Sequence, residues 1–143
     1  MQIQNVMSTN VASVNTEDTV EVAARLLSRR NIGVLPVTGA DGRLKGILTD
    51  RDIVLRCVAA SFDPALTKVR QVMTANPITL RPEDEVESAS ALMAQRQIRR
   101  LPVTEDGKLV GMVSLGDLAV QPDYTTEAAE CLSDICENLR RSS

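Results

Sequence analysis

Two short segments of the chain place a hydroxyl side chain three positions before an aspartate. Thr49 and Asp52 form the first pair, and Ser114 and Asp117 form the second. An apolar run precedes each pair, so we expect a strand to end and a helix to begin there. Free backbone N–H groups at such a junction attract a phosphate, to which the hydroxyl can also donate, and a carboxylate one turn further on can accept both hydroxyls of a ribose. The same spacing also forms an ordinary helix cap, in which the hydroxyl and the acid bind only the backbone.

The composition argues against several other kinds of chemistry. The 143 residues include no histidine and carry a formal net charge of −3, with an isoelectric point near 5.0. The absence of histidine removes histidine-dependent nucleophiles and histidine-bearing zinc sites, and no metal is expected. The acidic balance argues against a nucleic-acid partner. The apolar runs are too short for a membrane span, and we expect neither a secretory signal nor a membrane partner.

The three cysteines favour a cytoplasmic protein. Their number is odd, and Cys131 and Cys136 lie five positions apart, which matches neither a Cys-x-x-Cys redox pair nor a metal knuckle. Cys57, Cys131 and Cys136 are therefore expected to be small buried hydrophobic residues.

The elements that must position these side chains occur twice. Residues 6–8 (Val-Met-Ser) return as residues 72–74 (Val-Met-Thr), an offset of 66, and the Leu-Pro-Val-Thr sequence at 35–38 recurs unchanged at 101–104. After one deletion the offset becomes 65, so that the two hydroxyl–aspartate pairs also align. Self-similarity over this length indicates a tandem duplication.

Each repeat predicts an element order of β-α-β-β-α. Asp18 is expected to cap the first helix while Glu21 reaches back, and Asp84 with Glu87 repeats this start in the second copy. The buried stripe of the first helix is expected to contain Val20, Ala23, Ala24 and Leu27. The elements predicted for the first copy are a strand at 11–14, a helix ending near 29–31, strands at 34–38 and 44–48 joined by a turn, and a helix from about residue 50.

The fold class is therefore α/β with two similar units. A unit of about 60 residues buries too little apolar surface alone, so we expect the two to pack sheet against sheet around a pseudo-two-fold axis. The expected boundaries are 1–60 for the first unit, 61–71 for a connector, 72–121 for the second unit and 122–143 for a final helix. Thr125 would cap that helix, which serves as a lid on the core or as a dimer contact. Its shared face would contain Ala128, Leu132, Ile135 and Leu139.

The repeated motifs resemble those of a tandem pair of cystathionine-β-synthase (CBS) domains, a Bateman module. The chain is similar to small stand-alone two-CBS proteins of the hypoxic response protein type. The resemblance implies a role in binding AMP, ADP or ATP for Thr49, Asp52, Ser114 and Asp117. It is carried by residues 6–8, 32–38 and 46–52 and by their counterparts at 72–74, 98–104 and 111–117.

The resemblance further implies that each binding cleft combines both copies. One cleft would join Ser114 and Asp117 to Val11, Ala12, Ile32 and Gly33. The other would join Thr49 and Asp52 to Pro77, Ile78, Ile98 and Arg99. Because only 1% of the residues are aromatic, an adenine would lie between aliphatic walls rather than stack on rings.

The copies differ in charge at one position of interest. Gly33 and Val34 of the first copy become Arg99 and Arg100 in the second, which together with Arg96 form a candidate phosphate clamp. If the clamp operates, the two clefts differ in the number of phosphates they prefer. The alternative is that these arginines are solvated or contact the acids of a partner.

Three functions compete on these observations. The favoured function is a regulatory sensor that binds an adenosine nucleotide and is expected to be a homodimer. A change in its conformation or assembly would signal to an unidentified regulated protein. The second is a dimeric interaction scaffold with vestigial clefts, and a sensor of another adenosyl ligand such as SAM or NAD is a further alternative. An enzyme is disfavoured by the missing histidine and by the lack of an unmatched pair of acids.

Overall fold

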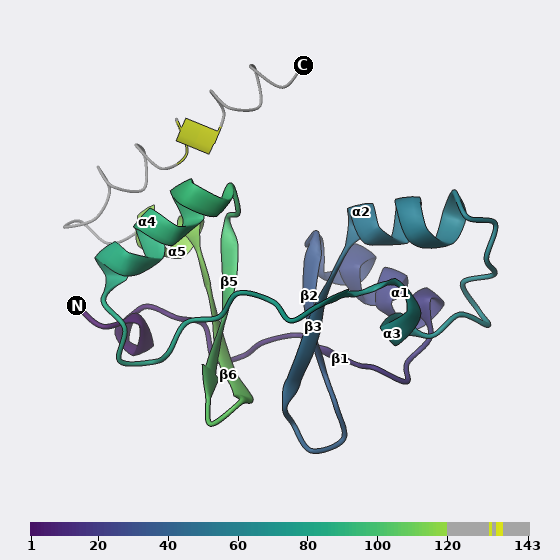
Figure 1. The fold of residues 1–143 in the computed structure, drawn as a ribbon, viewed down its shortest axis with the longest axis horizontal. Helices are drawn as coiled ribbons and strands as arrows, with labels where there is room; N and C mark the ends of the chain where they lie inside the picture. Colours follow the sequence, from purple (N-terminus) through teal and green to yellow (C-terminus); the bar gives the residue numbers. More distant parts are fainter. Residues whose placement is uncertain (120–131, 133, 136–143) are drawn as a thin grey trace. The chain divides into compact units, whose positions relative to one another are not determined.

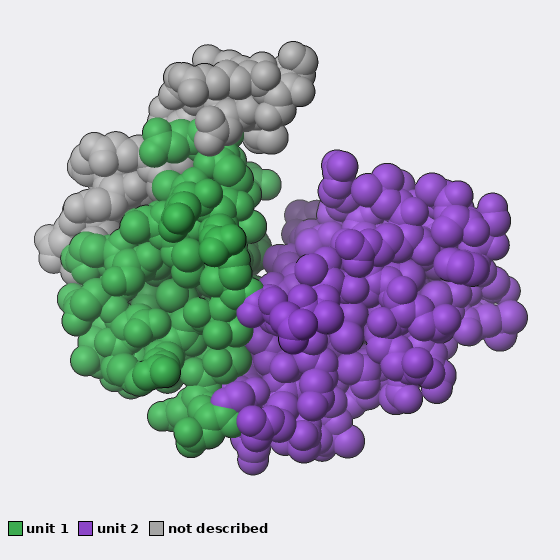
Figure 2. All heavy atoms as spheres, in the orientation of Figure 1, with its two compact units in different colours: residues 1–11, 78–106, 110–143 green, residues 12–77, 107–109 purple. Residues whose placement is uncertain are grey.

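The chain forms two compact units, each assembled from both repeats. The computed structural model describes residues 1–119, 132, 134 and 135. Unit 1 contains residues 1–11, 78–106 and the described residues from 110 onward, and unit 2 contains residues 12–77 and 107–109 (Figure 2). The opening segment of each repeat thus belongs to the unit that the other repeat builds. The boundaries expected from the repeat stay a prediction.

Unit 2 is a four-stranded sheet with helices packed against it (Figure 1). Its strand order is β1-β2-β3-β4, with β1 parallel to β2 and the other neighbours antiparallel. Its elements are β1 Val14–Asn15, α1 Val20–Arg30, β2 Val34–Thr38, β3 Leu44–Thr49, α2 Asp50–Ile53, the π-helical η2 Val54–Val58, α3 Val69–Val72 and β4 Thr74–Ala75. This order confirms the α/β class and the predicted sequence of elements, although the first strand is shorter than expected.

Unit 1 repeats this layout around the hairpin of β5 and β6. Isolated bridges replace the two outer strands, because Leu80 pairs in parallel with Val103 and Ser8 pairs antiparallel with Met112. Its elements are the 3-10 helix η1 Ile3–Asn5, α4 Val86–Arg96, β5 Arg100–Glu105, β6 Lys108–Ser114 and α5 Leu115–Ala119. The duplication seen in the sequence is therefore also a duplication of local structure.

Each unit has its own aliphatic core. The predicted stripe on α1 is confirmed, since Val20, Ala23 and Leu27 are buried and Ala24 is half-buried. In unit 2 the three buried residues of this stripe pack with Val14, Leu35, Val37, Leu48, Cys57, Val69 and Val72. The core of unit 1 is formed by Ile3, Leu80, Val86, Ala89, Met93, Leu101, Val103, Val113, Leu115, Leu118 and Ile135. Each of the larger aliphatic side chains contributes about 1.5–3 kcal/mol by burial, which supplies the stability that aromatic residues provide elsewhere.

The predicted cap of α1 is wrong by one residue. Thr19 is the N-cap, and its Oγ1 accepts a hydrogen bond from the backbone N–H of Val22 at 3.2 Å. Asp18 instead accepts from the backbone N–H of Asn15 at 2.8 Å. The extended backbone of Thr19 directs its hydroxyl toward the first turn, whereas Asp18 closes the preceding turn.

The same correction applies to the second copy. Asp84 accepts from the backbone N–H of Arg81 at 2.8 Å, while the N-cap of α4 is Glu85, whose side chain makes no capping hydrogen bond. The aspartates that recur before α1 and α4 therefore stabilise turns rather than helix ends.

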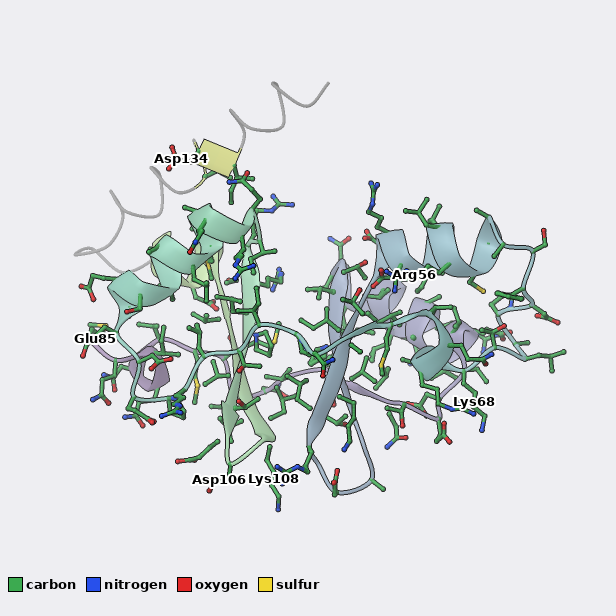
Figure 3. All side chains as sticks on the ribbon, in the orientation of Figure 1. Arg56, Lys68, Glu85, Asp106, Lys108 and Asp134 are labelled. Carbon is green, nitrogen blue, oxygen red and sulfur yellow. The ribbon has the colours of Figure 1, made fainter. Side chains whose placement is uncertain are left out.

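The segment that links the repeats, residues 61–71, packs against unit 2. Val69 on α3 is fully buried, and Thr67 is also buried, with its hydroxyl donating to the carbonyl of Asp63 at 2.8 Å. Glu17 pairs with Lys68 at 3.7 Å and with Arg70 at 2.9 Å. Lys68, which is labelled in Figure 3, lies directly before α3. These ion pairs are exposed and contribute at most about 1 kcal/mol each, so burial anchors this segment.

Only part of the expected final helix lies among the described residues. Leu132, Asp134 and Ile135 are helical, with Ile135 buried in the core of unit 1 and Leu132 exposed. Thr125, Ala128 and Leu139 lie outside the described residues, as do Cys131 and Cys136. Cys57 is a buried free thiol, as expected. Within residues 1–119, 132, 134 and 135, no helix is long and apolar enough to cross a membrane.

Candidate functional site

The first hydroxyl–aspartate pair forms a reciprocal cap where β3 meets α2. The Oγ1 of Thr49 accepts from the backbone N–H of Asp52 at 3.0 Å, and Oδ2 of Asp52 accepts from the backbone N–H of Thr49 at 3.0 Å. We call residues 33–34 and 49–52 the unit 2 junction. The capping interpretation of this motif is therefore correct for the folded chain.

The second pair repeats this geometry where β6 meets α5. The Oγ of Ser114 accepts from the backbone N–H of Asp117 at 3.0 Å, and Oδ2 of Asp117 accepts from the backbone N–H of Ser114 at 2.8 Å. We call residues 99–100 and 114–117 the unit 1 junction. Both copies thus use the same atoms in the same way.

Capping does not exhaust the hydrogen-bonding capacity of these side chains. Each hydroxyl acts as an acceptor in the cap and retains its own O–H as a donor. Each carboxylate uses Oδ2 for the cap, which leaves Oδ1 for another donor. Asp52 is half-buried with 12% of its side chain exposed, so this second oxygen lies near the surface without full solvation. Capping and ligand binding are therefore compatible at both junctions.

The second oxygen of Asp52 has neighbours that the sequence motif did not reveal. The hydroxyl of Thr74 donates to Oδ1 at 3.5 Å, and Nε of Arg56 lies 4.0 Å from the same oxygen. Arg56, which lies on η2 and is labelled in Figure 3, also donates to the carbonyl oxygens of Val72 and Met73 at 3.3 and 3.0 Å. Arg56 thereby connects the aspartate to the opening segment of the second repeat. Its position one turn after Asp52 was the available sequence signal.

Each junction includes the residue that precedes the first strand of its hairpin, which is Gly33 before β2 and Arg99 before β5. The backbone N–H of Asp50 donates to the carbonyl of Gly33 at 3.0 Å, and that of Leu115 donates to the carbonyl of Arg99 at 2.9 Å. Gly33 therefore lies beside the hydroxyl–aspartate pair of its own unit, and so does Arg99. The cross-copy grouping expected from the resemblance assigns these two residues differently and stays a prediction.

The other predicted ligand contacts are distributed over both units. Unit 1 contains Val11, Ile78 and Ile98, and unit 2 contains Ala12, Ile32 and Pro77. All six are half-buried, which leaves part of each side chain accessible. The guanidinium groups of Arg96, Arg99 and Arg100 are exposed, and no ion pair involves them within the described part of the chain.

Packing within unit 2 fills the space beside Gly46. Its lack of a side chain suggests room for a flat ligand, but a Cβ atom there would lie 2.6 Å from the carbonyl oxygen of Thr74 and 2.8 Å from Sδ of Met73. The space beside Gly111 is filled in the same way by Met7, whose Sδ would lie 2.7 Å from a Cβ atom added to the glycine. The space beside each glycine is occupied by the methionine of the Val-Met-Ser/Thr motif. The joint recurrence of these motifs was the sequence signal for this contact.

The described residues offer no metal-binding cluster. They contain no group of three or more His, Cys, Asp or Glu side chains that could hold a metal ion. Since zinc sites are built from such groups, the described side chains do not fit a structural zinc.

Comparison with known proteins identifies the family. Residues 3–58 and 69–121 each match the model of the CBS domain, and the chain belongs to the CBS domain family. It is 44% identical over 133 residues to the CBS domain-containing protein YhcV of Bacillus subtilis (strain 168), covering 93% of this chain and 94% of that protein. A pair of such domains is a regulatory ligand-binding module.

The chain is also similar to a hypoxic response protein and to a solved structure of that type. Hypoxic response protein 1 of Mycobacterium tuberculosis is 33% identical over 116 residues, covering 81% of each chain. The crystal structure of Hypoxic Response Protein I with two coordinated zinc ions has a TM-score of 0.78 at 32% identity, covering 85% of this chain and 98% of that one. The predicted resemblance to proteins of this type is therefore confirmed.

A solved CBS pair also carries adenosyl compounds. The CBS domain pair of protein MJ0100, in complex with 5′-methylthioadenosine and S-adenosyl-L-methionine, has a TM-score of 0.71 at 26% identity. The alignment covers 83% of this chain and 93% of that chain.

Proposed function

We propose that this protein is a regulatory sensor that binds an adenosine nucleotide, of the AMP, ADP or ATP type, at its two junctions. The observation that carries the proposal is the duplicated cap of Thr49 with Asp52 and of Ser114 with Asp117. In both copies the cap leaves one hydroxyl proton and one carboxylate oxygen that take no part in it, and in Asp52 this oxygen also accepts from Thr74 at 3.5 Å. The adenosyl ligands of the related MJ0100 pair support this class of ligand.

The available atoms match the polar groups of a nucleotide. The O–H of Thr49 or Ser114 can donate to a phosphate oxygen. This hydrogen bond offsets the repulsion between the phosphate and the nearby carboxylate. The second oxygen of Asp52 or Asp117 can accept from a ribose hydroxyl. We propose aliphatic contacts for the adenine, since the half-buried side chains are aliphatic. These contacts are Val11, Ala12, Ile32, Gly33, Pro77, Ile78 and Ile98, and Arg99 and Arg100 are the proposed phosphate contacts.

Signalling requires that the ligand bind two arrangements of the protein with different affinity. We propose a homodimer as the assembly that responds, and a reducing cytoplasmic location that keeps Cys57 as a free thiol. Regulation rather than catalysis is proposed because the sequence contains no histidine, and within the described ranges no metal cluster is present.

Titration with defined nucleotides tests the proposal. Calorimetry with AMP and with ATP is expected to give saturable binding to the native protein, and binding to the double variant Asp52→Asn, Asp117→Asn is expected to weaken at least tenfold. Asparagine keeps an oxygen that can accept the capping hydrogen bond, so the fold is preserved.

A matched control uses the two aspartates that only close turns. The double variant Asp18→Asn, Asp84→Asn alters the same chemical group and the same kind of backbone hydrogen bond away from both junctions. It is expected to bind as the native protein does. Equal affinity of the native protein and the Asp52→Asn, Asp117→Asn variant would contradict the proposed site.

The exposed apolar side chains after α2 favour a second candidate, a dimeric scaffold with vestigial clefts. Val54, Leu55 and Val58 on η2 are between 51% and 63% exposed, and Leu66 is 80% exposed. Apolar side chains gathered in this way are typical of interaction surfaces. Sedimentation analysis distinguishes the two functions. A dimer that forms without nucleotide, is lost in Leu55→Lys plus Val58→Lys, and binds neither AMP nor ATP would favour the scaffold.

A further inference from the structure

Each unit holds a methionine sulfur in the space that a glycine leaves open. The Sδ atom of Met73 lies 2.8 Å from the position of a Cβ atom added to Gly46, and Sδ of Met7 lies 2.7 Å from the corresponding position at Gly111. Met7 and Met73 occupy equivalent positions of the duplicated Val-Met-Ser/Thr motif. In both units, therefore, the opening segment of one repeat places a thioether against a strand of the other repeat.

These two methionines are intermediate in exposure among the methionines of the chain. Met7 and Met73 are half-buried, so part of each side chain faces solvent. Met1 is 45% exposed, whereas Met93 is fully buried and Met112 is 9% exposed. A small oxidant dissolved in water can therefore reach Met7 and Met73 in the folded protein, while their sulfur atoms still take part in packing.

The space beside each glycine is unsuited to an oxidised sulfur. The carbonyl oxygen of Thr74 lies 2.6 Å from the Cβ position at Gly46, and that of Ser8 lies 3.0 Å from the one at Gly111. A sulfoxide oxygen is polar and accepts hydrogen bonds, so a neighbouring carbonyl oxygen repels it and offers it no proton. Burying a polar group without a donor is costly. A sulfoxide at either methionine is therefore expected to leave this space for water.

The backbone pairing beside each methionine is short. In unit 1 the backbone N–H groups of Ser8 and Met112 donate to each other's carbonyl oxygens at 2.8 and 3.0 Å, and this pair is an isolated bridge. In unit 2 the pairing of β4 with β3 extends over two residues. Because so few backbone hydrogen bonds hold the opening segments, packing of the methionine side chain is needed to keep them in place.

We propose that Met7 and Met73 form a duplicated oxidation site through which a peroxide releases the opening segment of each repeat. The lone pair of the sulfur attacks one oxygen of hydrogen peroxide, so that an S–O bond forms and the O–O bond breaks. The sulfur loses two electrons and becomes a sulfoxide, and the peroxide is reduced to water. The change is reversible, because methionine sulfoxide reductases restore the thioether. The inference is independent of nucleotide binding and adds a second input to the protein.

Graded treatment of the full chain with hydrogen peroxide tests the site. Peptide mass spectrometry is expected to find sulfoxide first at Met1, then at Met7 and Met73, while Met93 and Met112 stay reduced. Amide hydrogen exchange at Ser8 and Met112 and in the pairing of β3 with β4 is expected to accelerate roughly tenfold or more in the oxidised protein. Methionine sulfoxide reductases for both sulfoxide epimers are expected to restore the native exchange rates.

Leucine variants show which sulfur acts in which unit. Leucine keeps an apolar side chain of similar volume but cannot be oxidised. Met7→Leu is expected to protect only the pairing in unit 1, and Met73→Leu only the pairing in unit 2. The double variant keeps Cys57, the other thiols and Met1, and its exchange rates are expected not to change with peroxide. Met1→Leu is the matched control and is expected to respond as the native protein does.

Three results would each overturn the proposal. One is complete oxidation of Met7 and Met73 with no change in amide exchange, because the opening segments would then stay in place. Another is oxidation of Met93 and Met112 at the same rate as Met7 and Met73, because oxidation would then follow unfolding. The third is a double leucine variant that responds to peroxide as the native protein does, because a thiol would then be responsible.

Discussion

Replacing Gly46 by alanine tests how the opening segment of the second repeat is held on unit 2. The new Cβ would lie 2.6 Å from the carbonyl oxygen of Thr74, which is backbone, and 2.8 Å from Sδ of Met73. The sulfur can move, but the carbonyl cannot retreat without weakening the pairing of Gly46 with Ala75 and of Ile47 with Thr74. Overpacking of this kind costs about 1–3 kcal/mol, whereas the lower entropy of unfolded alanine returns about 0.4–1 kcal/mol.

The net expectation for Gly46→Ala is a loss of about 1–2 kcal/mol, measured by urea unfolding, with a fall in Tm of roughly 2–8 °C. Gly39→Ala is the matched control, because its Cβ would meet Cε of Lys45 at 2.8 Å and Oδ1 of Asp41 at 3.1 Å, which belong to exposed side chains that can move aside. It is expected to be close to neutral. A Gly46→Ala protein as stable as the native one would refute the claim that the methionine and the backbone of β4 fill this space.

Three further predictions concern local features of the fold. Thr19→Ala removes the cap of α1 and is expected to cost about 1 kcal/mol in urea unfolding; no loss of stability would argue against this cap. The backbone N–H of Arg43 donates to Asp41, and this hydrogen bond lowers the pKa of Asp41 below 3.8. The stabilisation that Asp41 contributes to the fold is complete above the pKa of its unfolded form and is lost as the pH falls through its lower folded pKa. A carboxyl NMR titration of Asp41 with a midpoint at or above 3.8 would contradict the lowered pKa. Cys57→Ala removes a fully buried sulfur that donates to the carbonyl of Phe62 at 3.5 Å, and it is expected to lower the unfolding free energy by about 1–2 kcal/mol, a conclusion that an unchanged urea midpoint would reverse.

Local patterns predicted most of the secondary structure correctly. The stripe on α1 and the strands β2 and β3 agree with their sequence periodicity, because burial of one face is encoded in residue spacing. The cap of α1 was misplaced because Asp18 and Thr19 are both good capping residues. Only the backbone conformation at Thr19 decides which of them reaches the first turn.

The sequence predicted which residue types form the site but did not predict which distant residues contact one another there. The duplicated motif identified Thr49 with Asp52 and Ser114 with Asp117, since their spacing alone allows the reciprocal cap. Arg56 was missed because its contacts with Val72 and Met73 join residues that lie far apart in the sequence.

The sequence by itself determined the family and the duplication, which follow from motifs that recur 65 to 66 residues apart, and the two hydroxyl–aspartate caps, which depend on residues close together in the chain. Only the tertiary structure decided that Met7 fills the space beside Gly111, that Met73 fills the space beside Gly46, and that each repeat supplies its opening segment to the other unit. These outcomes follow from packing between distant segments. These contacts depend on side-chain volume and on backbone pairing between distant segments. The local periodicity of the sequence encodes neither of these two properties.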